Sequence, residues 1–294
     1  MRIGAHVPVA DGLRVAVEYA VGTGCETIQV FAKSPQRWVG TRRDPAEAAE
    51  FVTACGDRGI APVFTHAGYL INLGADDPDQ WDRSWMALGD ELARAALLGA
   101  AGVVVHLGRR FADDDTASAR RIVETVARAF DVAGPEAPEI LLENSAGAGR
   151  QFGSSPEEMA LALNAVREAG LPGALCFDTC HGLAAGIDVT SVSGWTSLID
   201  RFDELTGARA IALVHANDCK GSPGSHLDRH AWIGEGCVGE GGFAAMLAEP
   251  RLSGIPAIVE MPGDMPVKDA ENVSRLKRLR GDAAGPVARV RERA

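Results

Sequence analysis

The chain has 294 residues, of which 46% are apolar and 23% are charged, as in a soluble globular protein with a sizeable core. No apolar stretch approaches the length of a membrane span, and the first residues lead into a strand-like segment without a signal-peptide pattern, so we expect a cytoplasmic protein. The net charge of −11 argues against a nucleic-acid partner, but bound divalent cations and basic loops can reverse the local field at a cleft.

Eight apolar runs predict strands, and segments with helical features separate them. In chain order the runs are 3–7, 27–31, 63–66, 103–106, 140–143, 175–178, 212–215 and 258–260. Helix starts are marked at Asp44 and Ser155, where a polar N-cap precedes a proline and, shortly after it, a glutamate. Apolar stripes at helical spacing run through 87–98 and 122–130.

Eight strands that alternate with helices are what a small parallel barrel needs. We therefore predict an α/β fold with a single (β/α)8 TIM barrel over residues 1–282 and a loosely ordered C-terminal tail over residues 283–294. A doubly wound open sheet is the competing architecture. It is disfavoured because it would spread its strand ends along a wide edge instead of gathering them at one mouth.

Each of the last six predicted strands ends in a strong metal ligand. These residues are His66, His106, Glu143, Asp178, His215 and Glu260, at successive spacings of 40, 37, 35, 37 and 45 residues. The carboxyl ends of parallel strands in a closed barrel meet at one end, so the six side chains should converge there. Histidine together with carboxylate suits Zn²⁺, and also Mn²⁺ or Fe²⁺.

Three further candidates lie near the predicted strand ends. His181 follows Asp178 by three residues, and Asp228 and His230 occupy alternate positions, which face the same side of an extended segment. So many ionisable groups would repel one another and lose hydration unless metal ions were bound among them. His226 fits the same alternation, whereas we interpret His6 as a hydrogen-bonded core or rim residue and not as a ligand.

Five motifs surround these ligands in a fixed order. They are HAGYLINL at 66–73, ENSAG at 143–147, FDTCH at 177–181 with AAG at 184–186, HAND at 215–218, and DRH at 228–230 followed by IGEG at 233–236. With them the chain resembles the endonuclease IV, or deoxyribonuclease IV, family of apurinic/apyrimidinic (AP) endonucleases. The resemblance runs from residue 3 to residue 260.

The resemblance implies a TIM barrel that acts in base excision repair on double-stranded DNA containing abasic sites. Such an enzyme hydrolyses the phosphodiester 5′ to the abasic site and leaves a 3′-OH and a 5′-deoxyribose phosphate. The resemblance is also compatible with a second activity, the removal of blocking groups from 3′ ends. The nucleophile would be a metal-bridging hydroxide at a trinuclear zinc centre. We expect a monomer, because one nuclease acts on one lesion.

The resemblance also assigns the ligands to three zinc ions. The first ion would take His66, His106 and Glu143; the second would take Glu143, Asp178, His215 and Glu260; the third would take His181, Asp228 and His230. Glu143 would be both the bridging ligand and the catalytic residue that orients the nucleophile. Mn²⁺ or Fe²⁺ at one or more of the sites remains open.

Contact with DNA is assigned to two loops. By resemblance, Tyr69 and Leu70 push into the DNA stack, helped by an arginine from the loop after the second strand. Here the chain departs from the family, since Gln36 stands where the arginine is expected and Arg37 comes one residue later. A second departure is the segment HLGR at 106–109, where many relatives carry a proline-glycine pair.

Two other functions fit parts of this pattern. A metal-dependent sugar isomerase of the xylose isomerase type shares the barrel and gathers similar ligands, but it holds one or two metals, and the group around Asp228 and His230 argues for a third. A non-catalytic binder of damaged DNA would not need nine ligands.

Overall fold

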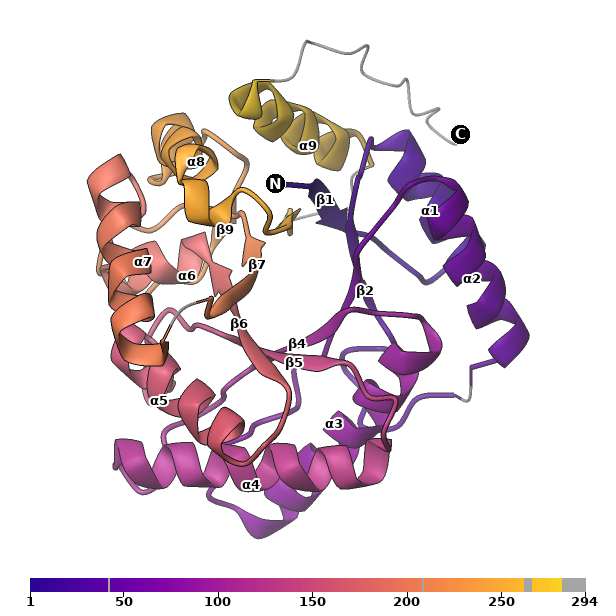
Figure 1. Ribbon diagram of the computed structural model, residues 1–294, viewed down its shortest axis with the longest axis vertical. Coiled ribbons are helices and arrows are strands. Elements are labelled where there is room, and N and C mark those ends of the chain that lie inside the picture. The colour runs from indigo at the N-terminus through magenta and orange to yellow at the C-terminus, as the bar shows by residue number, and fades with distance from the viewer. Residues whose placement is uncertain (42, 208, 262–265, 282–294) are drawn as a thin grey trace.

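Eight parallel strands close into a ring, and helices cover the outside of that ring (Figure 1). This computed structural model describes residues 1–41, 43–207, 209–261 and 266–281. The strands are β1 (Ile3–His6), β2 (Ile28–Phe31), β3 (Val63–His66), β4 (Gly102–His106), β5 (Glu139–Glu143), β6 (Gly173–Asp178), β7 (Ile211–His215) and β10 (Ala257–Val259). Around the barrel they follow the order β1-β10-β7-β6-β5-β4-β3-β2, so the predicted TIM barrel is confirmed.

Helices lie between successive strands. They are α1 (Leu13–Gly22), α2 (Pro45–Asp57), α3 (Pro78–Leu97), α4 (Asp115–Ala133), α5 (Pro156–Glu168), α6 (Thr179–Ala185), α7 (Val192–Thr206), α8 (Gly239–Ala248) and α9 (Pro266–Arg280), with a short 3₁₀ helix over Pro250–Leu252. Both predicted helix starts are confirmed: Asp44 accepts a hydrogen bond from the Ala46 amide, and Ser155 accepts one from the Glu158 amide. None of the described helices combines the length and hydropathy that crossing a bilayer requires.

One element lies outside the barrel pattern. A two-stranded antiparallel sheet joins β8 (Asp218–Cys219) to β9 (His230–Ala231), with Cys219 opposite His230. The sequence pattern did not predict it, because strands of two residues carry no detectable alternation. The predicted boundary between the barrel and the tail over 283–294 falls outside the described residues and stays a prediction.

The interior of the barrel is apolar directly beneath the predicted ligands. Phe64, Val104, Leu141, Cys176, Leu213 and Ile258 form one buried cluster with Ala174. Each of these six residues precedes a predicted ligand by two positions, and residues two apart on a strand point to the same face. The barrel therefore places a layer of buried apolar side chains, the apolar floor, directly under the ring of ligands.

Candidate metal centre

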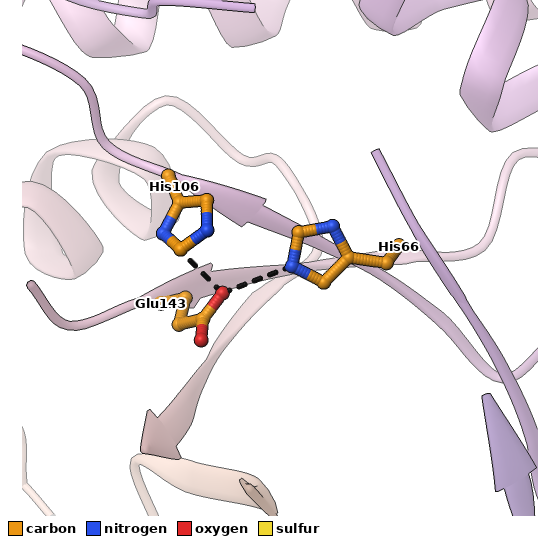
Figure 2. A group of neighbouring side chains, drawn as sticks. All are labelled: His66, His106 and Glu143. Atoms are coloured by element: carbon orange, nitrogen blue, oxygen red, sulfur yellow. Dashed lines mark hydrogen bonds and ion pairs between the residues drawn. The ribbon is translucent and has the colours of Figure 1, made fainter. Parts of the chain in front are cut away.

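The strand-end ligands converge on Glu143, whose side chain is only 1% exposed. Its Oε2 atom lies 3.1 Å from Nε2 of His66 and 3.4 Å from Nδ1 of His106 (Figure 2). Its Oε1 atom lies 3.0 Å from Nδ1 of His215, on the opposite side of the carboxylate. Glu143 thus presents one oxygen to each of two groups of donors, as a bridging ligand must.

The second group gathers around His215. Its Nδ1 atom is 3.3 Å from Oε2 of Glu260 and 3.9 Å from Oδ2 of Asp178. The ligand atoms of Glu143, Asp178, His215 and Glu260 all lie within 4.8 Å of one another, and the same holds for His66, His106 and Glu143. These are the two sets expected for the first and second metal ions.

The third predicted set is brought together less tightly. Asp228 lies 3.4 Å from Nε2 of His181 through Oδ2, and 3.5 Å from Nε2 of His230 through Oδ1. Among the described residues, the ligand atoms that lie within 4.8 Å of one another are instead those of Asp178, His181 and His230, and those of Cys180, Asp228 and His230. The sequence predicted no cysteine ligand, because its six cysteines lack the spacing of a cysteine zinc site, yet Cys180 lies between two predicted ligands in the 177–181 motif.

Backbone carbonyls orient three of the histidines. Nδ1 of His66 lies 2.7 Å from the Ala67 carbonyl oxygen, Nδ1 of His181 lies 2.9 Å from that of Asn144, and Nδ1 of His230 lies 2.9 Å from that of Glu260. A carbonyl oxygen can only accept, so each Nδ1 donates. The neutral imidazoles then keep the Nε2 lone pair for a ligand, which is the usual second-layer support of metal-bound histidine.

Two asparagines that the sequence did not single out position the acidic ligands, Asn217 through a carboxylate and Asn144 through the backbone of Asp178. Asn217 donates to Oδ2 of Asp178 at 2.6 Å and accepts from the backbone amide of Glu260 at 2.7 Å. Asn144 accepts from the Asp178 amide at 2.6 Å and donates to the Asp178 carbonyl at 3.0 Å. Asn144 lies in the 143–147 motif and Asn217 in the 215–218 motif, so their position next to predicted ligands in the sequence could have indicated this role.

The two histidines left open by the sequence lie near the centre but outside its donor groups. Nδ1 of His6 is 3.2 Å from Oε1 of Glu260, close to the second group. Nδ1 of His226 donates to the Ala146 carbonyl at 2.8 Å, so His226 supports the loop after β5.

The charges of the centre fit bound cations. Burial opposes ionisation of Glu143, but the neighbouring His106 and His215 hold its pKa well below the ordinary value. Burial likewise opposes a charge on His181, yet Asp178 and the other carboxylates raise its pKa to about 10. The neighbouring carboxylates likewise raise the pKa of His66 and His215 against the effect of burial, and divalent ions can take the place of the protons on these histidines. The donor set therefore suits a metal centre.

The predicted DNA-contacting residues lie on two joined loops beside this centre. Tyr69 is 62% exposed and Leu70 is 36% exposed. The Tyr69 ring meets the edge of Phe31 at 5.5 Å between centroids and lies 6.1 Å from the His66 ring. The Tyr69 amide donates to the Pro35 carbonyl at 3.1 Å, which joins the β3–α3 loop to the β2–α2 loop. Gln36 and Arg37 are both exposed on that second loop.

The HLGR segment at 106–109, which departs from the expected proline-glycine pair, needs its glycine for the shape of the loop. Gly108 has a φ of 86°, a left-handed conformation that favours glycine. A Cβ there would lie 2.0 Å from Oδ1 of Asn72, which accepts a hydrogen bond from the Arg109 amide at 3.0 Å. The loop after β4 is therefore packed closely against the loop after β3.

Comparison with known proteins places this geometry in a family. The xylose isomerase-like TIM barrel family matches residues 17–279. The chain is 36% identical over 279 residues to a probable endonuclease 4 of Methanoculleus marisnigri, covering 95% of this chain and 99% of that protein. It is 36% identical over 284 residues to a probable endonuclease 4 of Streptomyces coelicolor, covering 95% of each.

Solved structures agree with this placement. The crystal structure of endonuclease IV from Thermus thermophilus superposes with a TM-score of 0.85 at 35% identity, covering 96% of this chain and 100% of that one. A D-tagatose 3-epimerase-like protein superposes with a TM-score of 0.69 at 17% identity, covering 96% of this chain and 98% of that one. The second likeness supports the fold alone.

Proposed function

This chain belongs to the endonuclease IV family, and from that premise we propose that it hydrolyses the DNA phosphodiester 5′ to an abasic site. The products would be a 3′-OH and a 5′-deoxyribose phosphate, and cleaning of blocked 3′ ends would use the same centre. The observation that carries the proposal is Glu143, whose two oxygens serve two donor groups at the mouth of the barrel. The sugar isomerase alternative is supported by the fold and by the broad description of the matching barrel family, whereas the relatives at 36% identity are named probable endonuclease 4.

We assign three Zn²⁺ ions to the ligand sets expected from the sequence, with His181, Asp228 and His230 as the third set. Mn²⁺ or Fe²⁺ would accept the same donors. When bound, such ions lower the pKa of a water molecule and stabilise negative charge on phosphate oxygens. Imidazole and carboxylate donors bind all three metals, so which metal occupies the sites depends also on the concentrations of these ions in the cell.

The protein's own groups supply the geometry of the reaction. The pKa of Glu143 lies well below its ordinary value, so Glu143 is an ionised acceptor at neutral pH and can orient an attacking water. The apolar floor around Leu141 closes the site from below. The side chains of His106 and Asp228 are 36% and 53% exposed, so the phosphate would approach from the loop side.

Recognition of the lesion would use the exposed rim. Tyr69 and Leu70 are large apolar side chains that can enter a base stack, and an abasic nucleotide is easily displaced because it has no base to unstack. Arg37 is an exposed cation on the loop that is joined to theirs, with Gln36 beside it. We propose that a monomer engages double-stranded DNA in this way.

A single preparation tests the proposal. Zinc content and incision should be measured together, with a duplex oligonucleotide that carries one tetrahydrofuran abasic analogue. We expect about three zinc ions per chain and a single cut 5′ to the analogue. A zinc-loaded protein that leaves this duplex intact would refute the nuclease function.

Glu143→Gln tests the catalytic residue. We expect the variant to bind the duplex in a gel-shift assay and to lose incision by about two orders of magnitude or more. The matched control is Glu139→Gln, because Glu139 begins the same strand at the opposite end of the barrel. Equal cleavage by Glu143→Gln and the unaltered protein would contradict the role of Glu143.

A further inference from the structure

Gln29 lies among the ligands without belonging to any donor group. It is fully buried on β2, where it pairs in register with His6 of β1. Its Oε1 atom is 2.8 Å from Nε2 of His215. Its Nε2 atom is 2.8 Å from Oε1 of Glu260 and 2.9 Å from Nδ1 of His6. One neutral side chain thus contacts two proposed ligands of the second ion.

The chemistry of these contacts determines which atom donates. Nε2 of Gln29 faces Oε1 of Glu260, and a carboxylate that serves as a metal ligand has no hydrogen to donate, so the group facing Glu260 is the amide NH₂. The amide oxygen of Gln29 then faces His215 and can only accept. His215 must therefore carry a hydrogen on Nε2.

This arrangement leaves a specific pair of atoms facing the centre. With Nε2 of His215 donating to Gln29, the neutral ring has its lone pair on Nδ1, which is 3.0 Å from Oε1 of Glu143. With Oε1 of Glu260 accepting from Gln29, Oε2 of Glu260 is the oxygen that faces Nδ1 of His215, at 3.3 Å.

His215 differs in this respect from three other histidines of the centre. His66, His181 and His230 donate through Nδ1 to backbone carbonyls, which no substitution of a side chain removes. His215 instead presents Nδ1 to the centre, and its Nε2 atom donates to the side chain of Gln29, which a substitution can remove. The orientation of the second donor group therefore depends on Gln29.

We propose that Gln29 is a positioning residue of the second metal site, where its amide selects Nδ1 of His215 and Oε2 of Glu260 as the ligating atoms. The inference rests on the proposed metal centre and deepens it. Loss of such an outer partner weakens metal binding about 10- to 100-fold. Because His66, His181 and His230 keep their carbonyl partners, the loss should affect one ion of the centre.

Gln29→Leu tests the proposal, since leucine has a similar volume and no polar atoms. Zinc affinity should be measured by competition with a chromophoric chelator, and we expect one ion per chain to bind about 10- to 100-fold more weakly. In ¹⁵N spectra of zinc-loaded, histidine-labelled protein, the resonances of His215 should shift or broaden while those of His66 and His181 stay unchanged.

Gln29→Glu keeps the acceptor that His215 needs. A carboxyl oxygen still accepts from Nε2 of His215, so the His215 resonances should stay close to those of the unaltered protein. The matched control is Thr65→Val, which removes a buried hydroxyl that has no partner among the described residues. This control should change neither affinity nor spectrum.

Two outcomes would overturn the role of Gln29: unchanged zinc affinity with an unchanged His215 spectrum in Gln29→Leu, or His215 resonances of Gln29→Glu that shift or broaden relative to the unaltered protein. Circular dichroism verifies folding, and the glutamate variant carries the test alone if the leucine variant fails to fold. Both readouts are independent of DNA cleavage, so a failure of the proposed function would show separately, as missing incision by the unaltered protein.

Discussion

Arg37 differs from Lys33, Arg110 and Arg150, because its guanidinium has no side-chain partner among the described residues. Lys33 is buried and lies 2.9 Å from Asp90. Arg110 pairs with Glu158, and Arg150 lies 3.0 Å from Asp113. Those cations hold loops together, whereas the charge of Arg37 is available to a phosphate backbone.

At this residue scale, Arg37→Ala should weaken binding of abasic duplex about tenfold and lower the salt dependence of the binding constant by about one unit of slope. Gln36→Ala is the neighbouring control and should leave the slope unchanged, because glutamine is neutral. Fluorescence anisotropy with a labelled tetrahydrofuran duplex over a range of KCl concentrations measures both. An unchanged slope in Arg37→Ala would show that Arg37 contacts no phosphate.

At the scale of elements, α3 supports both loops of the proposed DNA-reading rim. Lys33, from the β2–α2 loop, donates to the Ala87 carbonyl and to Asp90 at 3.2 and 2.9 Å. Glu91 accepts from the Gly68 amide at 3.2 Å, one residue before Tyr69. Helix α3 therefore holds both loops in position through these hydrogen bonds.

Glu91 makes this support sensitive to pH. Burial raises the pKa of Glu91 to about 7, and the neighbouring Lys33 offsets that effect only in part. The unfolded chain releases the proton near 4.5, so the free energy of unfolding should fall as the pH rises from 4.5 to about 7. Glu91→Gln keeps an acceptor for Gly68 and should remove this loss, which is roughly 3 kcal/mol at most.

Urea unfolding of both proteins at several pH values measures the difference. The gain from Glu91→Gln should be small near pH 4.5 and largest above pH 7. Glu124→Gln is the control, since Glu124 is 60% exposed in a surface pair with Arg121 and should change stability little at any pH. A gain that does not depend on pH would contradict the assignment to Glu91.

At the scale of the whole molecule, closure of the barrel brings the last helix against the first strand. β1 pairs with both β2 and β10, and α9 lies beside β1 (Figure 1). Glu26 joins these parts: it accepts from the Ile3 amide at 3.0 Å, and its oxygens lie 2.8 Å from Arg280 and 3.2 Å from Lys277.

Glu26→Gln should therefore destabilise the protein. Partial burial opposes ionisation of Glu26, but Arg280 and the Ile3 amide together bring its pKa down to about 2. The stability contributed by this carboxylate is complete above pH 4.5 and is lost as the pH falls toward 2. With allowance for solvent, we expect a loss of about 1–3 kcal/mol at pH 7.

The check is chemical unfolding of the two proteins at pH 7 and at pH 3, where their difference should shrink. Glu18→Gln is the matched control, because Glu18 pairs with Arg14 on the exposed face of α1 with 63% of its side chain accessible. Equal stability of Glu26→Gln and Glu18→Gln at pH 7 would show that the contacts of Glu26 with Arg280 and Lys277 do not contribute to the free energy of unfolding.

Much of this architecture could be predicted from local patterns. Alternation within each strand places Phe64 and His66, or Leu141 and Glu143, on one face, so apolar floor and ligand follow from positions two residues apart. Repetition of the strand–helix unit predicted the barrel, and hence the convergence of the ligands. Imidazole and carboxylate donors indicated the kind of ion, and the motifs around them indicated the family.

Contacts across the barrel could not be predicted in the same way. Gln29 lies in the middle of a strand, 37 positions before the nearest predicted ligand, and it reaches His215 and Glu260 only because closure sets β1, β2, β7 and β10 side by side. The same holds for Cys180 near His230, and for Glu91 beneath Gly68. Periodicity and ligand type are local properties of the chain and can be read from it. The partner of a buried polar atom depends on strand register and side-chain packing, which exist only in the folded molecule.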